Sequence, residues 1–307
     1  MRVQLIAIPS VEATGESSTG PIAARAGGLA RASDAFLAAG LVENLASRGV
    51  EIAGVSRAAL PPDQTSGDRI VDLGRHGALV ADAVAGAVAA AALPVLAGGT
   101  CSHLPGMLAG LQRAYGPTSR IGLVWFDAHG DFNTPKTTRS GMLGGMPVAV
   151  AAGLCHPVWR EGAGMAVPLP TDRIVMVDVR NLDPEEAVLI DATAVTVAQL
   201  VPGKPGPTAE EAITALAERV DELYVHVDAD VLDARFQPNH PTVEPDGPDL
   251  DRTLAAIRAA FATGKVRAYA VVSVNPDGPD GPTSLASGMA MLTEALVTFL
   301  RRVPSEQ

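Results

Sequence analysis

The stretch IGLVWFDAHGDFNTP, residues 121–135, decides the fold of this chain. It opens on an apolar run that continues without polar alternation as far as Asp127. Strands that are apolar on both faces are typical of parallel sheets covered by helices on each side. The stretch therefore predicts a buried strand over residues 121–128, with polar side chains gathered at its carboxyl end.

Short apolar runs and longer helix-like patterns alternate along the rest of the chain. The runs predict further strands over residues 3–8, 50–55, 93–98, 173–179, 194–197, 223–230 and 267–274. The helical patterns cover residues 34–48, 74–92, 103–114, 208–221, 249–263 and 284–302. This alternation predicts an α/β fold with three layers (αβα) and a central, mostly parallel sheet of about eight strands. We expect residues 1–307 to form a single domain.

Composition narrows the functional class. The formal net charge is −11, which argues against a nucleic-acid partner or an anionic membrane and suits a cationic substrate or metal ions. The two cysteines, Cys101 and Cys155, cannot build a disulfide framework, so we expect a cytoplasmic location. The apolar run at the N-terminus stops at Pro9 and is too short for a membrane span.

Two segments interrupt the alternation. Residues 9–33 are small, polar and glycine-rich, and residues 234–248 are rich in proline. Each follows a predicted strand, and ligands of open parallel sheets bind at the carboxyl ends of strands. We therefore expect both segments to be loops that border the functional site.

The first chemical cluster follows the strand of residues 121–128. Asp127, His129 and Asp131 alternate, so an extended chain would place all three on one face. Carboxylates and an imidazole converging at the end of an apolar strand indicate a metal site. The alternative is a polar loop of capping residues.

The second cluster repeats this pattern. His226, Asp228 and Asp230 alternate at the end of another apolar run. Neighbouring carboxylates in a buried strand are costly without a cation, although a solvent-facing edge strand is an alternative. Two such clusters are most simply explained by a binuclear metal site.

The third cluster is a turn. Gly98 and Gly99 permit a tight connection from strand to helix and place Cys101 at its apex. Cys101 is then either a metal ligand or a small buried apolar side chain. His103, two residues on, is a rival ligand.

Taken together, these clusters resemble the ureohydrolase (arginase/agmatinase) family. The stretches that carry the resemblance are GGTCS (98–102), WFDAHGDFNTP (125–135), SGMLGGMP (140–147), RNLDPEE (180–186) and DADVLD (228–233). Their order and spacing match the family's order from about Gly40 onward.

The resemblance implies two divalent ions, most often Mn²⁺, bridged by a hydroxide that attacks a guanidinium carbon. It assigns Asp127 and Asp228 as bridging ligands. His129 and Asp230 would complete one ion, and Asp131 and Cys101 the other. Asn133 and Ser140 match positions that bind a substrate α-carboxylate. Asp183, with Glu186, matches positions near the α-amino group, and Thr242 falls where a threonine on the substrate side is expected. A homo-oligomer, either a trimer or a hexamer, is also implied.

Three positions depart from the family pattern. Cys101 replaces a histidine ligand, and its soft thiolate prefers Zn²⁺, Fe²⁺ or Co²⁺ to Mn²⁺. Gly144 replaces a histidine that passes a proton to the leaving amine, and Ser273 replaces a glutamate directed at the guanidinium.

These departures leave several outcomes open. His226 lies on the ligand face of its predicted strand and could supply the missing proton, or else hold a carboxylate in place. We expect Asp131 to act in catalysis as well as in metal binding. Cys101 and Gly144 also resemble a subgroup that hydrolyses Nω-hydroxyarginine, a substrate with a better leaving group. The chain is thus expected to hydrolyse arginine, a modified arginine or another guanidino or amidino acid; a catalytically impaired family member with a structural or regulatory role is the alternative.

Overall fold

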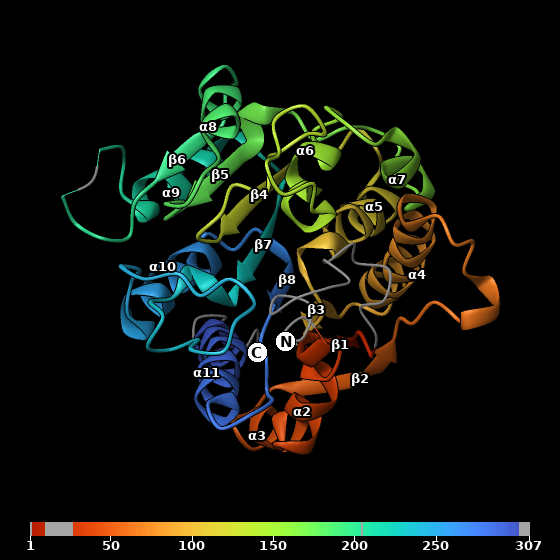
Figure 1. Cartoon of the computed structure of the whole chain (residues 1–307). Coiled ribbons are helices and arrows are strands. Elements are labelled where there is room, and N and C mark those ends of the chain that lie inside the picture. Colours follow the sequence, from red (N-terminus) through yellow and green to blue (C-terminus); the bar gives the residue numbers. More distant parts are fainter. Residues whose placement is uncertain (1, 10–26, 204, 301–307) are drawn as a thin grey trace.

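The computed structural model describes residues 2–9, 27–203 and 205–300. Its centre is an eight-stranded sheet in the order β2-β1-β3-β8-β7-β4-β5-β6 (Figure 1). Every pair of neighbouring strands runs parallel. The strands are β1 (Arg2–Ala7), β2 (Glu51–Arg57), β3 (Leu93–Ala97), β4 (Ile121–Phe126), β5 (Ile174–Val177), β6 (Thr196–Ala198), β7 (Glu222–Asp228) and β8 (Val266–Val272). The predicted three-layer α/β fold with about eight mostly parallel strands is confirmed.

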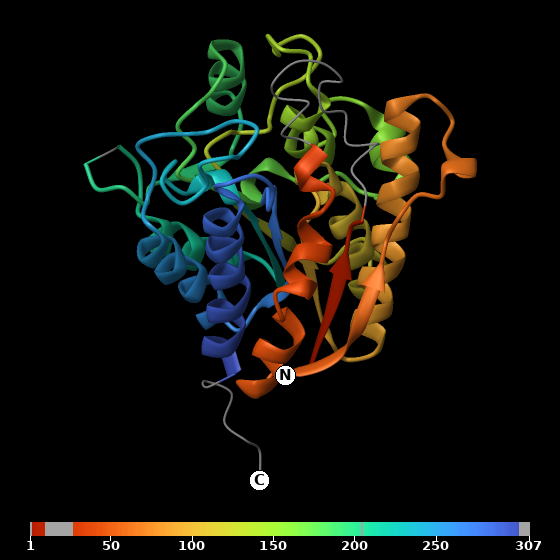
Figure 2. The ribbon, with the colours of Figure 1, turned by 60° about the horizontal axis from the view of Figure 1, so that its bottom comes forward.

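Helices cover both faces of this sheet. Figure 1 shows α4 to α7 gathered on one face and α10 and α11 on the other, and Figure 2 shows α4 and α11 on opposite sides of the strands. The helices are α2 (Ala32–Ala38), α3 (Leu41–Ser47), α4 (Arg69–Ala89), α5 (Leu104–Tyr115), α6 (Pro147–Ala151), α7 (Pro157–Gly162), α8 (Pro184–Asp191), α9 (Ala209–Arg219), α10 (Leu250–Ala262) and α11 (Gly281–Leu300). Short 3-10 turns lie at Pro62–Gln64, Cys101–His103, Leu143–Gly145, Thr171–Arg173 and Ala229–Val231. No helix in the described ranges is long and apolar enough to cross a membrane.

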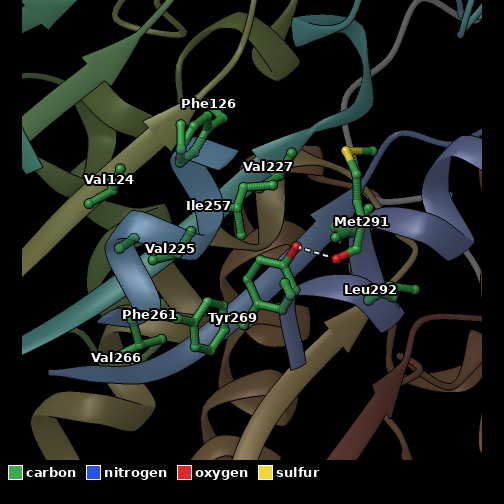
Figure 3. Packing of buried hydrophobic residues seen from close by; sticks show 14 of the residues in the cluster. Val124, Phe126, Val225, Val227, Ile257, Phe261, Val266, Tyr269, Met291 and Leu292 are labelled. Carbon is green, nitrogen blue, oxygen red and sulfur yellow. Dashed lines mark hydrogen bonds between the residues drawn. The ribbon is translucent and has the colours of Figure 1, made fainter. Parts of the chain in front are cut away.

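The sheet separates two hydrophobic cores, as alternate strand residues point to opposite faces. On the face of α10 and α11, Phe126, Val227 and Tyr269 are fully buried, and the Tyr269 hydroxyl donates to the Met291 carbonyl at 2.9 Å (Figure 3). Trp125 is fully buried in the core against α4 and α5. Burying each large apolar side chain contributes about 1.5–3 kcal/mol, so both faces stabilise the sheet.

Several predicted boundaries were wrong for local reasons. The helix expected over residues 34–48 is two helices, because Gly40 adopts a left-handed φ of 82° between α2 and α3. Helix α4 begins before residue 74 because the Asp68 side chain accepts from the amides of Ile70 and Val71. Helices α7 and α8 were not expected, and each begins with a proline, whose fixed φ suits a first helical position.

The order of the strands brings four strand ends together at one edge of the sheet, where a ligand could bind. The chain passes from β3 through α5 to β4, and the two later strands β8 and β7 fill the gap between them. Four neighbouring strands therefore end at the same edge of the sheet. Ligands of open parallel sheets bind at such an edge, where the strand order changes direction.

Helices α4 and α5 pack against each other at glycines. A Cβ added at Gly110 would lie 2.5 Å from Val84 Cβ and 2.8 Å from the Ala81 carbonyl. One added at Gly106 would lie 2.5 Å from the Gly77 carbonyl. The two helices can therefore pack this closely only because glycine has no side chain at these positions.

We predict that Gly110→Ala lowers the free energy of unfolding by about 1–3 kcal/mol, because the new methyl overpacks this contact. Gly86→Ala, on the exposed face of α4 with no atom within 4 Å of its new Cβ, is the matched control. It should raise the free energy of unfolding by about 0.5–1 kcal/mol. Urea unfolding followed by circular dichroism measures both, and a Gly110→Ala protein as stable as the wild type would contradict the prediction.

Candidate metal centre

A cavity of about 340 Å³ opens at the carboxyl ends of β3, β8, β7 and β4. Of the residues expected in the site, those that line it are Cys101, Asp127, His129, Asp131, Asn133, Ser140, Asp183, Glu186, Asp228, Asp230, Thr242 and Ser273. His226 is the expected site residue that does not line it. The residues that the sequence singled out thus largely share one cavity.

Within the described part of the chain, potential ligand atoms gather in the cavity in three groups, in each of which the atoms lie within 4.8 Å of one another. The first joins Cys101, Asp127 and Asp228, and the second joins Asp127, His129 and Asp230. The third joins Asp228 and Asp230 to His240. Each aspartate that belongs to two groups could bridge two neighbouring cations. Asp131 lines the same cavity but belongs to none of these groups.

Turns, rather than extended strands, bring the ligand atoms together. β4 ends at Phe126 and β7 at Asp228, so the expected extended faces over residues 127–131 and 228–230 were wrong. Asp228 caps the 3-10 turn that follows β7, its Oδ1 accepting from the Asp230 amide at 3.0 Å. Across the gap between the strands, Asp230 Oδ1 accepts from the Ala128 amide at 3.2 Å. Backbone amides therefore hold the carboxylates in place.

The charge in this cavity fits divalent cations. Burial raises the pKa of Asp127 well above its ordinary value, and the carboxylates of Asp230 and Asp228 raise it further. Burial and the neighbouring Asp228 likewise raise the pKa of the Cys101 thiol, whose Sγ lies 2.9 Å from Asp228 Oδ2. So many buried acids close together cannot all ionise unless positive charge joins them. The donor set of oxygens, one sulfur and imidazoles fits a divalent metal.

His129 is oriented by a carboxylate that the sequence did not reveal. Its Nδ1 lies 3.1 Å from Asp230 Oδ2, and its Nε2 lies 3.1 Å from Glu244 Oε1. Burial opposes protonation of His129, but Asp230, Asp127 and Glu244 outweigh burial and raise its pKa well above the ordinary value. A carboxylate behind a histidine in this way is typical of metal sites, where it fixes the ring. Glu244 lies in an aperiodic segment, which carries no signal for such a role.

His226 is fully buried and does not line the cavity. Its Nε2 lies 3.3 Å from Cys101 Sγ, its Nδ1 lies 2.7 Å from the Tyr224 hydroxyl, and its ring stacks on Trp125 at 4.1 Å between centroids. Burial lowers its pKa to about 3, and the neighbouring His103 adds to this. Among the candidate ligands, His226 therefore contacts the Cys101 thiol. Its expected part in proton transfer stays a prediction.

His103, the alternative to Cys101 as a ligand, makes contacts with Thr100 and His76 instead. Its Nδ1 lies 2.8 Å from the Thr100 carbonyl, and its ring packs edge-on against His76 at 4.9 Å. Burial lowers its pKa to about 3. It neither lines the cavity nor belongs to a ligand group in the described residues.

Four of the residues expected to bind substrate, Asn133, Ser140, Asp183 and Glu186, line the cavity. Asn133 donates from Nδ2 to Asp183 Oδ2 at 3.2 Å, and Ser140 is exposed at the rim. Glu186 and Asp183 form the capping box of α8, and Glu186 Oε1 also accepts from the Phe132 amide at 2.8 Å. Glu186 therefore braces the segment that carries the metal-site residues.

Two hydroxyls reach the acidic groups directly. Thr242 donates to Asp230 Oδ2 at 3.1 Å, and Ser273 donates to Asp228 Oδ2 at 2.5 Å. Ser273 has a left-handed φ of 61° just after β8. Gly144, the other departure from the family pattern, lines the cavity as well.

The two segments expected to be loops contribute to the cavity in part. From residues 234–248, His240, Pro241 and Thr242 line it, and from residues 9–33, Leu29 does. Residues 27–29 and the start of α2 are helical, so the expectation of a loop there was wrong. Residues 10–26 lie outside the described part of the chain.

Arg180 holds the chain segments around the site. Its guanidinium pairs with the fully buried Asp178 at 3.3 Å and donates to the carbonyls of Asp230 at 2.9 Å and Pro245 at 3.0 Å. One cation thus links the end of β7 to the segment that carries Glu244.

We predict that Arg180→Met lowers the free energy of unfolding by about 3–5 kcal/mol, because it removes the cation from beside a buried carboxylate. Arg235→Met, which breaks the exposed pair with Asp233, is the control and should cost less than about 1 kcal/mol. Denaturant unfolding of the two variants checks this, and equal losses would contradict it.

The fold and the cavity define a class: α/β proteins with a carboxylate-rich candidate metal centre at the carboxyl edge of a parallel sheet. The model of the arginase family matches residues 30–297. This chain belongs to the arginase family.

Individual relatives agree with this membership. An arginase of Bacillus caldovelox is 31% identical over 186 residues, covering 60% of this chain and 61% of the relative. An N(omega)-hydroxy-L-arginine amidinohydrolase of Streptomyces lavendulae is 36% identical over 169 residues, covering 55% of each. The matches thus span about three fifths or less of these curated relatives. In fold, a crystal structure of Bacillus subtilis arginase aligns with a TM-score of 0.80 at 22% identity, covering 97% of this chain and 98% of that one.

Proposed function

We propose that this chain is a hydrolase that uses two divalent metal ions to cleave a guanidino C–N bond of arginine or a modified arginine, releasing urea or an analogue. The observation that carries the proposal is that Asp127, Asp228 and Asp230 are each shared between two ligand groups inside one cavity. The family membership and the names of the relatives support it.

The proposed metal ligands are Cys101, Asp127, His129, Asp131, Asp228 and Asp230. We expect Mn²⁺, with Zn²⁺, Fe²⁺ or Co²⁺ as alternatives because a thiolate is a soft ligand. When bound, two such ions supply Lewis acidity that lowers the pKa of water toward neutrality. The chain's own part is positional: Glu244 fixes the His129 ring, and Arg180 fixes the backbone of Asp230.

The rim of the cavity suits a small amino acid. We propose that Asn133 and Ser140 donate to its α-carboxylate and that Asp183 accepts from its α-amino group. The carboxylates lie deeper and attract a guanidinium, which is a planar cation with several donors. The substrate would therefore enter with its guanidinium first.

One departure from the family pattern, Gly144, bears on which guanidine is cleaved. Gly144 offers no side chain to protonate a leaving amine, so a substrate with a better leaving group is favoured. The 36% identity to an Nω-hydroxy-L-arginine amidinohydrolase supports testing that compound beside arginine.

We predict that protein loaded with Mn²⁺ releases ornithine from arginine or Nω-hydroxyarginine but leaves agmatine, which lacks the carboxylate, intact. Asp127→Asn or Asp228→Asn should reduce kcat by about 1,000-fold, which corresponds to several kcal/mol of transition-state stabilisation. Asp233→Asn, next to the centre but outside every ligand group, is the control. Chromatographic detection of ornithine and agmatine measures the outcome. A metal-loaded protein without turnover on any guanidine would support the impaired family member instead.

A second prediction concerns the thiol. Cys101→His replaces a soft anionic ligand by a neutral one, so Mn²⁺ should bind roughly tenfold tighter. The pH of half-maximal activity should fall, because the site carries less negative charge. Isothermal titration with Mn²⁺ and a pH–rate profile measure these, with Cys155→Ser as the control outside the cavity. Unchanged affinity and profile would remove Cys101 from the metal ligands.

We further propose that the chain works in the cytoplasm as a homo-oligomer, a trimer or a hexamer, as the family resemblance implies. Light scattering of the purified protein tests the assembly.

A further inference from the structure

His240 is a buried histidine of the cavity that the family resemblance does not assign to the metal site. It is 4% exposed and lies between the turn after β7 and α10. Its Nε2 lies 3.4 Å from Asp228 Oδ1, and its Nδ1 lies 3.5 Å from Asp230 Oδ2. With these two carboxylates it forms the third group of potential ligand atoms.

The contacts of the ring indicate its tautomer. Nδ1 lies 2.8 Å from the Thr242 carbonyl, which can only accept, and 3.1 Å from the Thr242 amide. The shorter contact and the nearby Asp230 oxygen both favour a proton on Nδ1. In the neutral ring Nε2 then carries its lone pair toward Asp228. This is the arrangement of a metal-ligating histidine, whose other nitrogen donates to a carbonyl.

Two acceptor atoms that face each other across 3.4 Å require a positive charge between or beside them. A divalent cation meets this requirement, because it also neutralises the neighbouring carboxylates of Asp228 and Asp230.

The loop that carries His240 is anchored on both sides. Asn239 donates to the carbonyls of Asn275 at 2.9 Å and Asp277 at 2.7 Å, beyond the end of β8. The buried Gln237 donates to the Ser284 carbonyl at 3.2 Å. The ring is therefore positioned by the fold before any ligand arrives, as a metal site needs.

We propose that His240 Nε2 is a further ligand of the cation bound by Asp228 and Asp230. This inference rests on the proposed function, since it adds a donor to the same centre. Because Asp230 also belongs to the ligand group of His129, a cation held by Asp230 and both histidines would have two imidazole donors beside its carboxylates. Such a set favours Co²⁺, Zn²⁺ or Fe²⁺ over Mn²⁺, in the same direction as the sulfur of Cys101.

The test titrates metal-free protein with Co²⁺ by calorimetry. The wild type should bind two ions, and His240→Asn, which keeps a donor for the Thr242 carbonyl but lacks Nε2, should weaken one of them by at least about tenfold. His156→Asn is the matched control, because His156 lies outside the cavity, at a left-handed N-cap position that asparagine tolerates. Affinities of His240→Asn within twofold of the wild type for both ions would overturn the proposal and leave His240 as a counter-ion.

A measurement on the wild type makes the test independent of the folding of any variant. In proton NMR of the Co²⁺-loaded protein, each ligating histidine should give one strongly shifted, exchangeable N–H signal. We expect two such signals, from His129 and His240, and a single signal would overturn the proposal. Two bound ions with one signal would contradict this inference alone, whereas a wild type that binds no Co²⁺ would contradict the proposed function too.

Discussion

The structure depends on one electrostatic constraint: acidic side chains from separate strands lie together in a buried cavity. Asp127 and Asp228 are 1% and 5% exposed, and the Cys101 thiol lies 3.7 Å from the first and 2.9 Å from the second. Such groups repel one another when ionised in a medium of low dielectric constant. A fold that assembles them without cations would be less stable than one that keeps them apart, so the assembly itself indicates metal binding.

The topology of the sheet explains how distant residues meet. Strands β7 and β8 lie between β3 and β4, so all four strands end at the same edge of the sheet. The clusters that begin at Cys101 and Asp228, about 130 residues apart in the chain, therefore meet at that edge. Rigid supports then fix them: the Arg180 guanidinium ties the end of β7 to the segment before α10, and Glu186 braces the segment after β4. The candidate ligands thus lie on short turns held by a buried framework, as preorganised sites require.

Much of this was predictable from the sequence, because apolar runs and alternating acids are periodic signals. The sheet and twelve of the cavity residues follow from such signals and from the resemblance that they carry. Glu244 and His240 did not follow, because an aperiodic, proline-rich segment gives no indication of which side chains turn inward. The break at Gly40 and the early start of α4 depend on a single φ angle and a single cap, which periodicity does not register.

The most direct test of the central claim is an anomalous difference map from crystals of this protein grown with Mn²⁺. The account predicts two peaks in the cavity, with Asp127 and Asp228 each contacting both. A map without peaks there, or with the carboxylates of β4 and β7 turned away from each other, would contradict it.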